Sequence, residues 1–175
     1  LLEILRRKDV FAFLFISLLV QFSHGPYYTF FSIFLEEEGY SRSVIGLLWG
    51  GAVVAELALF LAMNWVLKRF SVRLVLLISL LGGSIRWLLI AYGSDSTMLI
   101  VIAQALHALS FASFHTIAVD WIRRAFGLKH QGQGQALYSA LSFGLGGALG
   151  VIVSGALWQN YAQLSWLVAA GSSFL

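Results

Sequence analysis

The chain has 175 residues, of which 59% are hydrophobic and 11% charged, and its mean hydropathy is +0.85. Soluble domains carry about 25% charged residues, so this composition excludes an ordinary soluble domain and is typical of a membrane protein. The absence of cysteine excludes disulfides and thiolate metal sites. We expect no cofactor and no bound metal.

Charged and turn residues divide the chain into six apolar segments, near 10–35, 43–67, 72–93, 97–122, 135–158 and 161–175. As helices, the first five can each cross about 30 Å of hydrocarbon. Ser41, Ser71 and Ser96 stand at expected N-cap positions. We expect the chain to be part of a longer protein, because it begins at Leu1 and its last segment is shorter than the about 20 residues that a span needs.

The connections between these segments alternate in charge. Nine of the 11 basic residues lie in three places: before the first segment, between the second and third segments, and between the fourth and fifth segments. The opposite connections hold Glu36, Glu37, Glu38 and Asp95 against Arg42. The positive-inside rule therefore predicts cytoplasmic termini, with residues 36–42 and Asp95 outside, in a multi-pass protein of the inner (cytoplasmic) membrane. The formal charge of +3 then reflects topology, and we expect no nucleic-acid partner.

The first segment carries a polar stripe and an interruption. Helical spacing places four polar side chains on one face, namely Gln21, His24, Tyr28 and Ser32. Gly25 and Pro26 lie in the middle of the segment, where a kink could open backbone groups to a ligand or serve packing alone.

Further ionisable residues lie inside the next three segments: Glu56 in the second, Arg86 in the third, and His107 and His115 in the fourth. A central Asp, Lys or Arg costs on the order of 2.5 to 3.5 kcal/mol in hydrocarbon, so each of these side chains should face protein or water. Gln104, His107 and His115 fall within an arc of about 80° on one helix face. A functional cavity is the favoured interpretation, and structural polar pairs between helices are the alternative.

The fifth segment repeats small residues every four positions, at Ser142, Gly146, Gly150 and Ser154. Such a face lets another helix approach closely, for static packing or for sliding between two packed states.

Six helices with a basic loop after the second resemble one half of a major facilitator superfamily transporter. The similarity is greatest to its branch of phenylpropionate permease, lactose permease and nucleoside symporters. The stretches that carry this resemblance are His24-Gly25 with Tyr27-Tyr28, Val54-Ala55-Glu56, Ile85-Arg86-Trp87, Leu106-His107 and Gln135 to Ala140. The basic loop Lys68 to Arg73 is a degenerate form of the superfamily's loop motif.

The resemblance implies an all-α membrane protein, with six transmembrane helices forming a 3+3 inverted repeat. This unit, residues 1–175, would be the C-terminal half of a 12-helix transporter whose N-terminal six-helix half lies outside this chain. The implied function is proton-coupled symport of a small organic solute, such as 3-phenylpropionate or a related aromatic acid. A nucleoside or a sugar is the alternative substrate.

The resemblance also assigns roles to residues. Arg86 and His107 match the arginine and histidine of lactose permease that couple proton to sugar, whereas Gln104 and Ser110 replace its lysine and glutamate. Glu56 is then the remaining buried carboxylate, and alternate pairing with Arg86 could load and release a proton. We expect proton coupling by Glu56, Arg86 and His107, and substrate binding by His24, Tyr28, Gln104, His115 and Arg86, whose planar fork suits a carboxylate.

Other functions fit the sequence less well. An intramembrane serine protease would need a histidine after Ser142 and Ser154, and none follows them. A six-helix carrier of three repeats would need a proline motif in its odd helices, and the chain has one proline. We therefore expect that the protein is not an enzyme. A structural or sensor membrane protein is the remaining alternative, which uptake measurements would distinguish.

Overall fold

A computed structural model describes residues 2–174, which form helices and no strand. The α-helices are α1 (Leu2–Leu5), α2 (Lys8–Ser23), α3 (Gly25–Glu37), α4 (Arg42–Arg69), α5 (Val72–Tyr92), α6 (Thr97–Ser139) and α7 (Gly147–Phe174). A π-helical turn, Ala140–Gly146, joins α6 to α7. The predicted all-α class is therefore confirmed.

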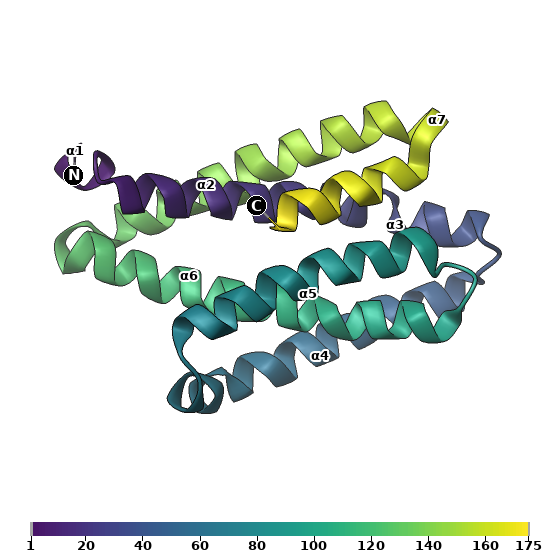
Figure 1. Ribbon diagram of the computed structural model, residues 1–175, viewed down its shortest axis with the longest axis horizontal. Helices are drawn as coiled ribbons and strands as arrows, with labels where there is room; N and C mark the ends of the chain where they lie inside the picture. Colours follow the sequence, from purple (N-terminus) through teal and green to yellow (C-terminus); the bar gives the residue numbers. More distant parts are fainter. Residues whose placement is uncertain (1, 175) are drawn as a thin grey trace.

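Four helical stretches are long and apolar enough to cross a membrane: Lys8–Glu37, Arg42–Arg69, Val72–Tyr92 and Thr97–Phe174. The last stretch has 78 residues and leaves helical backbone geometry at Gly127 (φ 64°) and Tyr161 (φ −147°). Figure 1 shows the chain reversing direction near both points. The first reversal falls between two predicted segments, and the second falls at the first residue of the last predicted segment. The count of six spans and the inverted repeat remain predictions.

The helix ends follow local sequence signals. Ser41 and Ser71 cap α4 and α5, since their Oγ atoms accept hydrogen bonds from Val44 N (3.4 Å) and Leu74 N (3.3 Å). Ser96 occupies the N-cap position of α6 without such a bond. The first predicted segment is interrupted as expected: α2 ends at Ser23 and α3 begins at Gly25. Pro26 has no N–H to continue the helical ladder.

The small-residue face of the π turn and α7 packs against α2 and α3. A Cβ atom added to Gly150 would overlap Phe22 O, and one added to Gly25 would overlap the backbone of Gly150. The predicted close approach of another helix to this face is therefore confirmed.

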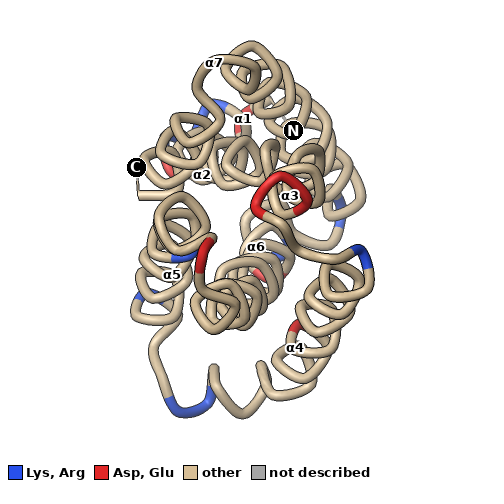
Figure 2. Tube along the Cα trace, turned by 90° about the vertical axis from the view of Figure 1, so that its right-hand side faces the viewer, with Lys and Arg blue, Asp and Glu red and all other residues tan. Residues whose placement is uncertain are grey.

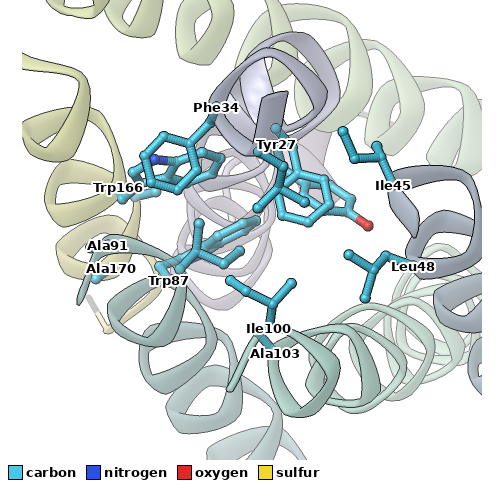
Figure 3. Close-up of a cluster of buried hydrophobic side chains, with 14 residues drawn as sticks. Tyr27, Phe34, Ile45, Leu48, Trp87, Ala91, Ile100, Ala103, Trp166 and Ala170 are labelled. Atoms are coloured by element: carbon cyan, nitrogen blue, oxygen red, sulfur yellow. The ribbon is translucent and has the colours of Figure 1, made fainter. Parts of the chain in front are cut away.

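One of three buried hydrophobic clusters among residues 2–174 lies where α3, α5 and α7 meet, with residues of α4 and α6 on its other side. Figure 3 shows rings from these three helices gathered there, and among them Trp87 and Trp166 are fully buried. The helix α4 packs mainly on α6, and Figure 1 places it at the edge of the molecule.

Charges separate along the helices. Glu36 and Glu37 end α3, and Arg42 at the start of α4 forms an ion pair with Glu36 (Nε to Oε1, 3.0 Å). Figure 2 looks onto this end and shows acidic residues at α3. Lys68 and Arg69 lie at the other end of α4, whose 28 residues span roughly 42 Å. This separation matches the predicted alternation, and which end is cytoplasmic remains a prediction.

Candidate functional site

A cluster of polar and ionisable side chains lies between four elements of the bundle. His24 comes from the α2–α3 junction, Glu56 from α4, Arg86 from α5 and His107 from α6. The Nη1 atom of Arg86 lies 3.4 Å from Nε2 of His24, and the rings of His24 and His107 are 5.9 Å apart. The Nε2 atom of His107 lies 3.3 Å from Oε2 of Glu56. Tertiary structure thus connects four sequence-predicted site residues in one chain of contacts.

Arg86 is a fully buried cation held by aromatic rings. Its exposure is 0%, and its Cζ atom lies 4.0 Å from the ring centroids of both Tyr27 and Trp87. Cation–π contacts of this kind contribute about 2 kcal/mol or more when desolvated. Neither Nε nor Nη2 has a hydrogen-bond partner among residues 2–174. Two strong donors on a buried cation are therefore left without an acceptor in the described part of the chain.

The neighbouring side chains hold this arrangement in place. The Tyr27 hydroxyl donates to Oε1 of Gln104 (2.8 Å), and the Trp87 indole N–H donates to Oγ of Ser173 (3.0 Å). The Nδ1 atom of His24 lies 2.8 Å from Val20 O. This contact favours a proton on Nδ1, which leaves Nε2 to accept from Arg86.

Glu56 pairs with His107 in this structure. The side chain of Glu56 is 20% exposed, whereas that of His107 is 5% exposed. Arg86 forms no ion pair within the described part of the chain. Alternate pairing of Glu56 with Arg86 would need a second conformation, and it remains a prediction.

The remaining predicted site residues occupy different positions. Gln104 is buried beside Tyr27, with its Nε2 atom lacking a partner among residues 2–174. Tyr28 is 52% exposed, and its ring lies 5.9 Å from that of His24. His115 lies farther along α6, where its Nδ1 atom is 3.2 Å from the Tyr138 hydroxyl. The ring of Phe111 stacks between His107 (5.5 Å) and His115 (5.8 Å). The structure therefore brings His115 to a second, aromatic group.

Sequence reasoning missed Tyr27 and Trp87 as the rings around Arg86. The predicted polar stripe contained Tyr28, which follows His24 by four positions. In the structure Tyr27 is fully buried (0% exposed) and Tyr28 is half-exposed, although the Tyr28 N–H still donates to His24 O (3.1 Å). The available signal was adjacency in the sequence, since Tyr27 precedes Tyr28 and Trp87 follows Arg86.

No metal site accompanies the cluster: residues 2–174 contain no group of three or more His, Cys, Asp or Glu side chains that could hold a metal ion.

A polytopic helical membrane protein with a buried polar cluster is the class that this fold and site define. The chain belongs to the MFS_1 like family, whose model matches residues 1–168. The resemblance to the major facilitator superfamily seen in the sequence is thereby confirmed.

Comparisons with individual proteins agree with this family. The Escherichia coli (strain K12) protein named "Probable 3-phenylpropionic acid transporter" is 35% identical over 152 residues, which are 86% of this chain and 40% of that protein. Nucleoside permease NupG of Escherichia coli (strain K12) is 25% identical over 130 residues, 69% of this chain and 31% of its own length. The chain thus spans well under half of the curated relatives that it matches.

A crystal structure of a mutant of the nucleoside transporter NupG has the same fold. It matches with a TM-score of 0.85 at 22% identity, over 98% of this chain and 47% of that chain. The relatives are transporters, and the chain is a multi-pass membrane protein of the same family.

Proposed function

We propose that this chain is the C-terminal six-helix half of a secondary active transporter. In this proposal it works with an N-terminal six-helix half, and the complete protein is a proton-coupled symporter. The coverage of the relatives, 40% and 31% of their lengths, supports a partial chain. A site between two bundles is the arrangement that alternating access requires.

The proposed substrate is a small organic acid, 3-phenylpropionate or a related aromatic acid. The observation that carries this proposal is the pair of unpartnered donors on Arg86, Nε and Nη2. These two N–H groups form one edge of the planar guanidinium fork, and a carboxylate accepts from such an edge through both oxygens. The name of the Escherichia coli relative with 35% identity supports the same substrate class.

Arg86 is fully buried, and its cation–π contacts offset only part of the free-energy cost of burying the charge. A bound carboxylate would offset more of this cost. A transported acid must also leave again. The rings of Tyr27 and Trp87 support the cation while no anion is present, which favours release.

The proposed coupling site is the pair of Glu56 and His107. A proton on Glu56 would neutralise the carboxylate and weaken its contact with Nε2 of His107. Neutralisation would also lower the free-energy cost of burying this side chain while the transporter passes through a closed conformation. Loss of that proton would restore the contact. Arg86 belongs to this coupling group if Glu56 reaches it in another conformation.

A nucleoside is the second candidate substrate. Gln104 Nε2 and His107 Nδ1 are buried donor or acceptor atoms without partners among residues 2–174, and they suit a neutral base or ribose. The relative NupG is named a nucleoside permease. A neutral nucleoside, however, would leave both free donors of Arg86 unsatisfied.

Uptake into proteoliposomes tests these proposals. The complete transporter is reconstituted into vesicles whose outside is more acidic than the lumen. Radiolabelled 3-phenylpropionate or radiolabelled uridine is then added outside. We expect accumulation of 3-phenylpropionate that a protonophore abolishes. Accumulation of uridine without 3-phenylpropionate uptake would overturn the assignment of an acid as the substrate. Uptake that the protonophore leaves unchanged would overturn proton coupling.

A further inference from the structure

Two cavities are lined by residues of α4, α5 and α6, and neither lining includes a residue of the polar cluster. One has a volume of about 190 Å³ and an apolar lining that includes Leu59 and Val66 of α4, Leu74 and Ile78 of α5, and Leu109 of α6. The other has a volume of about 170 Å³ and is lined by Leu67, Val72, Ile117, Asp120, Trp121 and Arg124.

One face of α6 runs past both cavities. Leu109 and Ser113 line the first cavity, and Ile117 and Arg124 line the second. Successive members of this set are four, four and seven positions apart, so they share one side of the helix. The apolar cavity therefore continues toward a mouth at which charged side chains begin. We call the two cavities together the α4–α6 groove.

The mouth of the α4–α6 groove is cationic. Arg123 and Arg124 both donate to the carboxylate of Asp120, at 2.8 Å and 2.6 Å, which leaves one positive charge in excess. Three further cations flank the short α4–α5 connection: Lys68 and Arg69 in the last turn of α4, and Arg73 in the first turn of α5. Residues 2–174 provide no ion pair for any of them. The Cζ atom of Arg69 lies 5.8 Å from the centroid of the Trp65 ring.

The surroundings of the groove are those of a bilayer-facing surface. Leu61 and Trp65 of α4 are 87% and 60% exposed, and Phe70 beside the mouth is 45% exposed. Trp residues favour the interface between hydrocarbon and head groups. A ligand that fills both parts of the groove needs an apolar tail and an anionic group.

We propose that the α4–α6 groove is a binding site for a phospholipid with an anionic head group. One acyl chain lies along the apolar cavity, and the phosphate lies at the mouth near Arg124 and the basic α4–α5 connection. A free anion would leave the apolar cavity unfilled, and a zwitterionic lipid would compensate the excess positive charge less well. Basic pockets between transmembrane helices recognise anionic head groups in this way.

Native mass spectrometry of the complete transporter tests this site. The protein is released from nanodiscs that contain equal amounts of dioleoyl phosphatidylglycerol and dioleoyl phosphatidylcholine. We expect retention of phosphatidylglycerol over phosphatidylcholine by at least about fivefold. Arg124→Gln removes one cation that lines the mouth and leaves the Asp120 carboxylate less compensated, so we expect it to weaken this preference. Leu74→Trp fills the apolar cavity, so we expect it to reduce retention of both lipids.

Arg42→Gln is the matched control. Like Arg124, Arg42 is exposed and pairs with one glutamate or aspartate, but it lies at the opposite end of α4. We expect this variant to keep the preference for phosphatidylglycerol. Equal retention of the two lipids by the unchanged protein would overturn the proposal, as would an equal loss in Arg42→Gln. Competition by inorganic phosphate alone at millimolar concentration would show a simple anion site instead. None of these outcomes depends on the substrate or on proton coupling.

Discussion

At the scale of single residues, the site is organised around a buried cation without a carboxylate partner. An uncompensated charge is expensive in a low-dielectric interior, and deletion of a partner usually destabilises such a site. In this protein Arg86 has two aromatic rings and one histidine nitrogen as its neighbours. Several weak contacts together compensate the guanidinium charge, and the Nε and Nη2 donors of Arg86 keep no hydrogen-bond partner among residues 2–174.

The first prediction concerns the shape of this cation. Arg86→Lys replaces a planar fork with a point charge, so we expect the affinity for 3-phenylpropionate to fall by about tenfold or more. The affinity for the uncharged 3-phenylpropanol should change much less. Isothermal titration with the complete transporter measures both. Equal losses for the acid and the alcohol would show that Arg86 supports the fold and does not bind the carboxylate.

The second prediction concerns the proton carrier. Glu56→Gln mimics the protonated carboxyl and removes its titration, so uphill uptake driven by a pH gradient should be lost. Exchange of labelled for unlabelled substrate involves no net proton movement, and we expect it to survive. Uptake and exchange in the same proteoliposomes measure the two effects. Unchanged uphill uptake would place the carrier elsewhere, with His107 as the next candidate.

At the scale of helices, glycine and serine allow α2 and α3 to lie against the π turn and α7. Ser142, Gly146, Gly150 and Ser154 are all buried along this contact. The extra residue in the π turn changes the direction of the following side chains relative to a continuous α-helix. This change keeps all four small residues on the packed side.

The third prediction tests this contact by adding one methyl group. Gly150→Ala would place a Cβ atom against the backbone of Phe22, so we expect a cost of about 1 to 3 kcal/mol. Gly147→Ala is the control, because a Cβ atom there meets no other heavy atom within 4 Å. The control should be neutral or slightly stabilising, since alanine favours helix. Thermal unfolding in detergent compares the two, and equal melting temperatures would contradict the packing described.

At the scale of the whole molecule, the charges of the connections predict how the bundle lies in the membrane. The acidic and basic connections lie at opposite ends of α4. The fourth prediction is that cysteines introduced by Glu38→Cys and Lys129→Cys react from opposite sides of the membrane, position 38 from outside. The chain has no native cysteine to interfere. Labelling of both positions by an impermeant reagent from one side would refute the topology.

The fifth prediction is that the chain alone does not transport. Alternating access requires one bundle to move against another, and a single bundle offers one wall of the site. Proteoliposomes that contain only these 175 residues should show no uptake above empty vesicles. Co-reconstitution with the N-terminal half should restore uptake. Transport by the chain alone would contradict the division of the site between two halves.

The sequence by itself determined the features that depend on hydrophobicity, charge and local backbone chemistry. Apolar length predicted the membrane helices, Ser41 and Ser71 marked helix starts, and Pro26 predicted the interruption of the first helix. Depth within apolar segments singled out Glu56, Arg86 and His107 as side chains that must face partners. Each of these inferences needs only neighbours along the chain.

Only the tertiary structure decided which side chains are the partners. It placed Tyr27 and Trp87 over Arg86, paired Glu56 with His107, and moved Tyr28 and His115 to the margins of the cluster. These contacts join different helices, so they depend on crossing angles and on rotation about each helix axis. Both are set by packing between helices, at glycine contacts such as Gly25 with Gly150, and periodicity along one segment does not contain them.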